Sequence, residues 1–266
     1  MICRTMVVAV SLIGTVGEAQ TPVGAGVTVG VAQLSAARTE QVVTGVLQLR
    51  ARPWLALSAI PSVVRLSHDT SGATVASGGL GDLPLVAGAT AMLPAPWTPT
   101  LGGALIVSLP TGNAACGFGS GQTTLGIDAG VGVAPTASLR FSADASRNLS
   151  GLAGPSFLRL EAAADVAPRW TLGVGVSAEV GAEDSLARSV GGGITRALAG
   201  AMALTVNASH GFTAASPRWV VSVGIGTVYT GISPVAPTSP LRRLQGSFAG
   251  GVGRGGGHGN GKAACG

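Results

Sequence analysis

The sequence has few charged residues and no long apolar run after its first residues, and each shortage excludes a class of protein. Only 10% of the 266 residues are charged and 46% are hydrophobic, whereas a soluble domain usually contains about 25% charged residues. A mean hydropathy of +0.49 points in the same direction, to a membrane environment. No later stretch of about 18 residues is continuously apolar, which argues against membrane-spanning helices. Because backbone groups in hydrocarbon must pair internally, a closed β-barrel is the remaining way to span a bilayer.

Net charge and cysteine content do not indicate nucleic-acid, metal or cofactor binding. The net charge is +5, but the basic residues are scattered and form no basic helix or aromatic-rich patch of the kind that binds nucleic acid. Cys3, Cys116 and Cys265 are far apart and form no CxxC metal motif. Export would allow Cys116 and Cys265 to oxidise; whether they pair is open, and we expect them to be incidental. The glycine run 191–193 lacks the following Lys-Ser/Thr of a phosphate loop.

The N-terminal residues 1–19 have the layout of a secretory signal peptide. Arg4 supplies a positive charge, and the following residues, 5–16, are mostly apolar. Small residues at 17 and 19 occupy the −3 and −1 positions that a signal peptidase recognises, which predicts cleavage before Gln20. An uncleaved anchor is the alternative, but the apolar run is shorter than the roughly 18 residues of a spanning helix.

Alternation of side chains is the strongest structural signal in the rest of the chain. From Trp170 to Val180, apolar residues alternate with small or polar ones. Since successive side chains of a strand point to opposite faces, this segment has one apolar face and one small, polar face. Its length suits a tilted strand that crosses a bilayer in roughly 9–11 residues. Similar segments predict an all-β fold, a transmembrane antiparallel up-and-down β-barrel of about 12 strands, near 23–33, 41–51, 54–64, 83–93, 100–109, 124–134, 137–146, 156–165, 170–181, 187–198, 201–210 and 218–229.

The connections between these segments alternate in length. The short ones carry proline at 52–53, 94–96, 135 and 168, and the longer ones span 67–82, 110–123, 146–155 and 211–217. Outer-membrane barrels have short periplasmic turns and longer outer loops, so we expect the chain to start in the periplasm. Trp54, Trp97 and Trp170 then lie at the periplasmic interface and Trp219 at the outer end of the last strand, as expected of amphipathic rings.

Composition divides the chain after the last predicted strand. We expect the barrel to occupy 20–231, with Tyr229 as the aromatic residue that ends its last strand. Residues 232–266 are rich in Pro and then Gly and lack an apolar pattern, which is typical of a flexible tail.

Three short motifs give the chain a family resemblance. A strand resumes at Gly81-Asp82-Leu83, another ends in 109–112 (Leu-Pro-Thr-Gly), and 54–61 ends in Ile-Pro before a long outer connection. In these motifs and in the layout of residues 40–230, the chain resembles the phenol-degradation meta-pathway transporter family of outer-membrane proteins. The resemblance implies a barrel of about twelve strands that takes up small, often aromatic or apolar, compounds.

Charged and amide side chains within the strands are candidates for lining the barrel interior. A charge that faces lipid near the bilayer midplane would cost about 2–4 kcal/mol for Arg or Lys, so we place these side chains inside. Two interpretations stay open: Arg140, Asp144, Arg159 and Glu161 pair across adjacent strands and fill the lumen, or they form a charged constriction that selects solutes. The lumen-lining candidates are Arg50, Asp128, Arg140, Asp144, Arg159, Glu161, Glu179 and Asn207.

No residue pattern indicates catalysis. His68-Asp69 and Ser67 are neighbours in sequence, but a serine nucleophile needs a base that a third group orients in space. We therefore predict a non-enzymatic, monomeric channel or transporter for small molecules in the bacterial outer membrane, with lipid as its surroundings and no cofactor. The alternative is an exported surface or structural β-protein, adhesin-like and without transport activity.

Overall fold

The structure is a computed structural model that describes residues 23–70, 73–97, 99–149, 156–180, 187–199, 202–214 and 216–227. The predicted signal peptide, Tyr229 and the predicted tail lie outside the described residues, so these expectations stay predictions.

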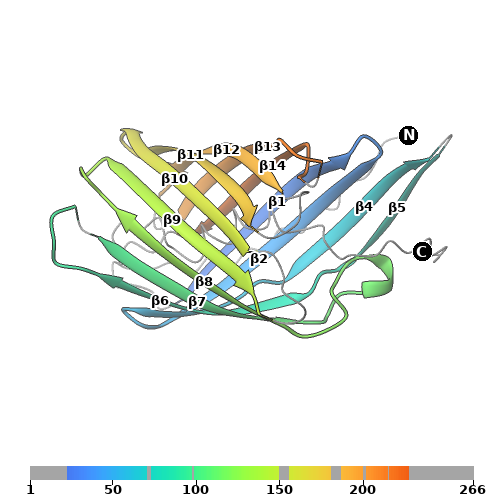
Figure 1. Cartoon of the computed structure of the whole chain (residues 1–266), viewed down its shortest axis with the longest axis horizontal. Coiled ribbons are helices and arrows are strands. Elements are labelled where there is room, and N and C mark those ends of the chain that lie inside the picture. The colour runs from blue at the N-terminus through green and yellow to red at the C-terminus, as the bar shows by residue number, and fades with distance from the viewer. Residues whose placement is uncertain are drawn as a thin grey trace.

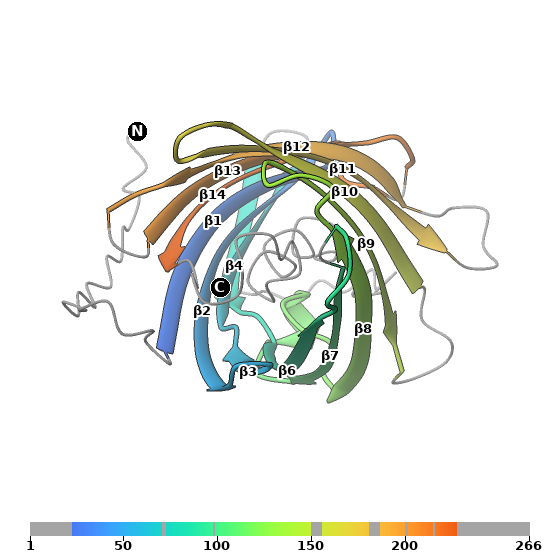
Figure 2. The same cartoon turned by 90° about the vertical axis from the view of Figure 1, so that its left-hand side faces the viewer.

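One antiparallel sheet accounts for nearly all of the described chain, and it closes on itself (Figures 1 and 2). Closure follows because the first strand pairs on one side with the second and on the other side with the last. The sheet contains 14 strand segments: β1 (Val23–Ser35), β2 (Arg38–Arg52), β3 (Leu55–Ala59), β4 (Ser62–Thr70), β5 (Ala73–Leu80), β6 (Leu83–Met92), β7 (Thr100–Leu109), β8 (Thr124–Val133), β9 (Leu139–Asn148), β10 (Ser156–Ala167), β11 (Trp170–Val180), β12 (Arg188–Ala197), β13 (Met202–Gly211) and β14 (Trp219–Thr227).

Two of the barrel strands are each divided in two, so the 14 segments make the 12 strands that the sequence predicts. On one side, β3 and β4 pair with successive parts of the same strand, β2. On the other side, β3 pairs with β6 and β4 pairs with β5. The breaks fall at 60–61 and 81–82, where Pro61 has no N–H to donate to a ladder. Pairing continues across the first break, because Gly45 N–H donates to the Pro61 carbonyl at 2.8 Å.

The strand periodicity sorts side chains between the two faces of the wall. Along β2, Val43, Leu47 and Leu49 are exposed on the outer surface, while Thr44 and Val46 between them are buried. On β8 to β14, the ionisable side chains on the outward face lie within one residue of a strand end; they are Arg147, Arg188, Arg196 and His210. The middle of this part of the wall, from β8 to β14, is therefore apolar on its outside. Among the described residues, no helix is long and apolar enough to span a membrane.

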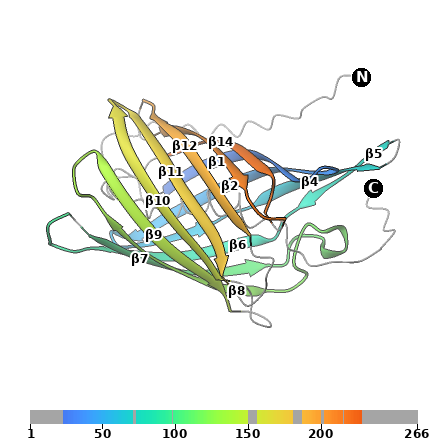
Figure 3. The same ribbon diagram turned by 45° about the horizontal axis from the view of Figure 1, so that its top comes forward.

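The segment 67–82, predicted as a long loop, is mostly strand, so that prediction is wrong. β4 and β5 form a hairpin in register from Val63↔Leu80 to Thr70↔Ala73, and it projects past the rest of the wall (Figures 1 and 3). Thr74 Oγ1 donates to Asp69 Oδ1 at 2.7 Å across it. The alternation of apolar and polar residues that predicts the other strands is absent here. A hairpin that projects beyond the membrane does not need an apolar face, so its polar sequence resembles that of a loop.

The connection after β7 folds onto this hairpin and is held by two of the three motifs that carry the family resemblance. The carboxylate of Asp82 accepts hydrogen bonds from Gly112 N–H at 3.1 Å and from the N–H and Oγ of Ser120 at 2.7 and 2.8 Å. Thr111 Oγ1 donates to the Gly81 carbonyl at 2.8 Å. The segments 81–83 and 109–112 thus form one hydrogen-bonded junction at the rim where the hairpin leaves the barrel.

Phe118 supplies the apolar part of the same junction. Its side chain is 6% exposed and packs on Gly79 of β5, where an added Cβ would lie 2.6 Å from the ring. A short 3-10 helix, η1 (Ala114–Cys116), precedes it. Cys116 is disulfide-bonded, so the expectation that this cysteine is incidental is wrong.

The tryptophans occupy the rims that the sequence predicts. Trp54, Trp97 and Trp170 lie at the β2–β3, β6–β7 and β10–β11 connections, which share one end of the antiparallel barrel. Trp219 begins β14 at the opposite end, where its indole N–H donates to Gln33 Oε1. Arg196 lies over the Trp170 ring, 5.1 Å from its centroid, a cation–π contact on the outside of the rim.

Candidate functional site

The barrel interior has an apolar wall and a polar wall. On the apolar wall, Val46, Ile60 and Val86 are at most 4% exposed and pack with Ala104 and Ile106. In this cluster the inward aliphatic side chains exclude water from one another, as in a soluble core. The inner face of β2 also buries polar side chains beside it, among them Glu40, Thr44 and Gln48.

The polar wall is built by β9 to β14. Four of the eight predicted lining residues are less exposed than both neighbours on their strands; they are Arg50, Asp128, Arg140 and Asn207. Asp144, Arg159, Glu161 and Glu179 line one or both of the cavities described below. Arg140 and Glu179 are each 3% exposed. Arg50 on β2 and Asp128 on β8 lie away from the cavities described below. Whether any of the eight selects solutes stays a prediction.

A bidentate ion pair joins β9 to β10. Arg140 Nη1 donates to Asp165 Oδ2 at 2.8 Å and Nη2 to Oδ1 at 2.5 Å, and Thr171 Oγ1 adds a third bond to Oδ1 at 2.7 Å. Arg140 is one of the predicted lining residues and is buried, whereas its partner Asp165 is not among those predicted. The signal was present, because Asp165 continues the alternate positions of Arg159 and Glu161 on β10.

Nearer the middle of the wall, Arg159 and Glu161 approach each other along β10. Arg159 Nε lies 3.8 Å from Glu161 Oε1, a loose contact with Glu161 41% exposed. Asp144 of β9 stands directly opposite Arg159 in the register. Arg140 therefore pairs across strands as the lumen-filling interpretation predicts, but with Asp165 rather than with Asp144 or Glu161.

Glu179 lies at the rim end of β11. Its Oε2 accepts a hydrogen bond from Ala187 N–H at 2.8 Å, just before β12 begins. Beside it, Arg188 N–H donates to Ser216 Oγ at 2.7 Å, and this hydroxyl donates to the Arg188 carbonyl at 2.8 Å. These bonds fix the β11–β12 and β13–β14 ends to one another, so Glu179 has a structural partner as well as an inward position.

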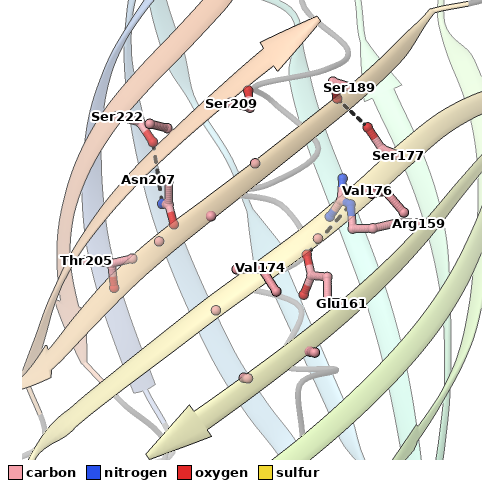
Figure 4. A pocket seen from close by; sticks show the side chains of 18 of the residues that line it. Arg159, Glu161, Val174, Val176, Ser177, Ser189, Thr205, Asn207, Ser209 and Ser222 are labelled. Atoms are coloured by element: carbon pink, nitrogen blue, oxygen red, sulfur yellow. Dashed lines mark hydrogen bonds and ion pairs between the residues drawn. The ribbon is translucent and has the colours of Figure 1, made fainter. Parts of the chain in front are cut away.

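A cavity of about 180 Å³ lies against the polar wall over β10 to β14. At its centre four glycines of two adjacent strands face each other, Gly173 with Gly193 and Gly175 with Gly191. A Cβ at Gly191 would lie 2.8 Å from Ser209 Cβ, and one at Gly193 would collide with the amide oxygen of Asn207. The glycines thus form a floor across which side chains of the flanking strands reach (Figure 4).

Polar side chains surround this floor. Arg159 and Glu161 stand on the β10 side, and Asn207 on the β13 side donates to Ser222 Oγ at 3.5 Å (Figure 4). Two hydroxyl pairs join neighbouring strands at the ends of the floor: the Oγ atoms of Ser177 and Ser189 are 2.7 Å apart, and the Oγ1 atoms of Thr195 and Thr205 are 3.1 Å apart.

A second cavity of about 220 Å³ adjoins the first toward the outer rim. The two share lining residues, and the second adds Asp144 and Glu179. The shared residues are Arg159, Ser177, Ser189, Ser209 and Val220. Within the described part of the chain, no cluster of three or more His, Cys, Asp or Glu side chains is placed to hold a metal ion.

No protein-family model matches the chain, and no curated protein is similar to it in sequence. Solved structures do match. An outer-membrane channel from Pseudomonas putida F1 is 14% identical, with a TM-score of 0.60 over 81% of this chain and 99% of that one. The KdgM porin is 8% identical, with a TM-score of 0.53 over 77% of this chain and 99% of that one. These likenesses confirm the outer-membrane barrel fold that the sequence resemblance implies.

Proposed function

We propose that the protein is an outer-membrane channel for small molecules. The observation that carries this proposal is the division of the closed wall into an apolar outside and an interior that holds the ionisable groups. A charge on the outside near the midplane of a bilayer would cost about 2–4 kcal/mol, and the mid-strand charges of β9, β10 and β11 avoid that face. The likeness to a channel and a porin supports the same function.

A catalytic role finds no support. Ser67, His68 and Asp69 are consecutive residues of β4, so their side chains alternate between the two faces of the hairpin. A serine, a base and an orienting acid must converge on one side of the chain. Consecutive strand residues do not do so.

The alternative of a secreted structural β-protein is also less well supported. Such a protein would expose its outer wall to water, and this wall exposes large apolar side chains such as Leu160 at 57% and Val174 at 64%. An apolar belt of this extent is the expected outer surface of a membrane barrel.

Conductance across a planar lipid bilayer tests the proposal. We expect the purified barrel to give stepwise ion currents. Replacing Arg159 and Glu161 together by alanine should change the conductance or the cation-to-anion preference, because both groups line the cavity. The matched control is Leu160→Ala, which alters the outward residue between them and should leave the currents as they are. Absence of current from correctly folded protein would contradict a channel.

A further inference from the structure

We propose that the cavity over the glycine floor is a binding site for a neutral, single-ring solute that carries several hydroxyl groups, a molecule of monosaccharide size. The inference deepens the proposed function by naming a substrate class for the channel, and it rests on that function for its biological meaning. Its physical basis is the shape and chemistry of the cavity alone.

The shape favours one flat ring. Neighbouring strands lie about 4.8 Å apart, so β10 and β13, separated by three such steps, are about 14 Å apart along the wall. Between them the inward positions 173, 175, 191 and 193 have no side chain. At Gly173 the floor is open, because an added Cβ would meet only the Ala162 carbonyl at 3.8 Å. With about 180 Å³, the cavity is smaller than the roughly 300–1,000 Å³ pockets of drug-sized ligands.

The chemistry favours hydroxyl groups on the solute. Most of the polar side chains around the floor are neutral hydroxyls, which both donate and accept hydrogen bonds, as do the hydroxyls of a sugar. Asn207 adds an amide that does the same. Most of these groups already form hydrogen bonds within the wall, but hydroxyl oxygens can accept a second bond. An apolar ring would cover this remaining capacity without using it, which is unfavourable. The hydroxyl-bearing residues of the lining are Thr171, Ser177, Ser189, Thr195, Thr205, Ser209 and Ser222.

The charges at the edge favour a neutral solute. Arg159 and Glu161 lie 3.8 Å apart and present one charge of each sign to the cavity, so an ion of either sign meets both attraction and repulsion there. None of the described lining residues is aromatic, so an aromatic solute finds no ring to stack against.

Saturation-transfer NMR on the detergent-folded barrel tests this binding without requiring conduction. With D-glucose as the probe, we expect saturation transfer to the sugar protons from the unmodified barrel. Asn207→Leu keeps the size of the side chain but removes the amide, and should weaken glucose binding about tenfold, the loss expected for one hydrogen bond. Gly173→Leu should abolish it by filling the open part of the floor.

Matched controls place the effect on the inward face. Val206→Ala changes the outward neighbour of Asn207, and Gly103→Leu adds the same side chain on the outward face of β7; both should bind glucose like the unmodified barrel. Ser209→Ala serves as a milder variant should Asn207→Leu not fold, and should weaken binding too.

Three outcomes would overturn the assignment: no saturation transfer to glucose, equal transfer in the floor variants and the unmodified barrel, or displacement of glucose by phenol at lower concentration. Failure of the proposed function is separable, because it would appear as absent ion current in bilayers whatever the NMR result.

Discussion

At the scale of single residues, the buried Arg140–Asp165 pair shows how a lumen charge is stabilised. The guanidinium is 3% exposed and makes two short bonds to one carboxylate, while Asp165 remains 38% exposed. Bidentate pairs of this kind combine charge with fixed geometry.

We predict that Asp165→Ala lowers the free energy of unfolding by about 2 kcal/mol, since it leaves the buried Arg140 charge without its acceptor. Denaturant unfolding of the detergent-folded barrel, followed by tryptophan fluorescence, measures the change. The double variant Arg140→Met with Asp165→Ala should recover part of the loss. If the double variant is no more stable than Asp165→Ala alone, the pair is not what stabilises this part of the wall.

Adjacent residues of β13 test which face meets lipid. Val206 is outward and 37% exposed, whereas Thr205 next to it faces the cavity. We predict that Val206→Arg lowers the free energy of unfolding in lipid vesicles by about 2–4 kcal/mol. Thr205→Arg, with the same side chain one residue away, should cost clearly less because it can be hydrated inside. Equal costs for the two variants would contradict the assignment of faces.

At the scale of elements, the junction around Asp82 holds a long connection in one place. Its carboxylate accepts bonds from two backbone N–H groups of the segment 110–123, and this segment also packs Phe118 onto β5. A loop fixed by several such contacts opens less often than a free one.

We therefore predict that Asp82→Ala releases this connection without opening the barrel. Hydrogen exchange at Gly112 and Ser120 should accelerate by roughly tenfold or more, because each amide loses its acceptor. Asp69→Ala is the matched control: it removes a carboxylate from the neighbouring hairpin, bonded to Thr74, and should leave these two amides unchanged. Unchanged exchange in Asp82→Ala would mean that Phe118 packing alone holds the segment.

The same elements show how far the sequence predicts this structure. The strand period predicts the 12 barrel strands, because one wall face must suit lipid at every second position. The strand period does not predict the β4–β5 hairpin, because the hairpin lies outside the part of the wall where lipid requires apolar outward side chains. The strand period also does not predict the apolar cluster around Ile60. Where both faces of a strand carry aliphatic residues, the sequence does not show which of them face lipid and which face the interior. Predicting the partner of Arg140 requires the register between β9 and β10, and the alternation of residues along one strand does not determine that register.

At the scale of the whole molecule, closure of the sheet is the property that allows the chain to span a membrane. Pairing of β1 with both β14 and β2 leaves no free edge around the ring, and β5 alone extends a hairpin past it. A closed wall satisfies its backbone groups within itself, which is the condition for standing in hydrocarbon. The chain thus forms a closed barrel that spans the outer membrane, with cavities inside that polar side chains help to line.

Electrophoretic mobility of the outer-membrane protein with and without boiling tests that claim most directly. The chain is expressed in a Gram-negative host, outer membranes are isolated, and heated and unheated samples are compared on a gel with mild detergent. A closed barrel resists the detergent until it is heated, so we expect a mobility shift on boiling and recovery in the outer-membrane fraction. A product found in the periplasm or medium, with the same mobility before and after boiling, would contradict it.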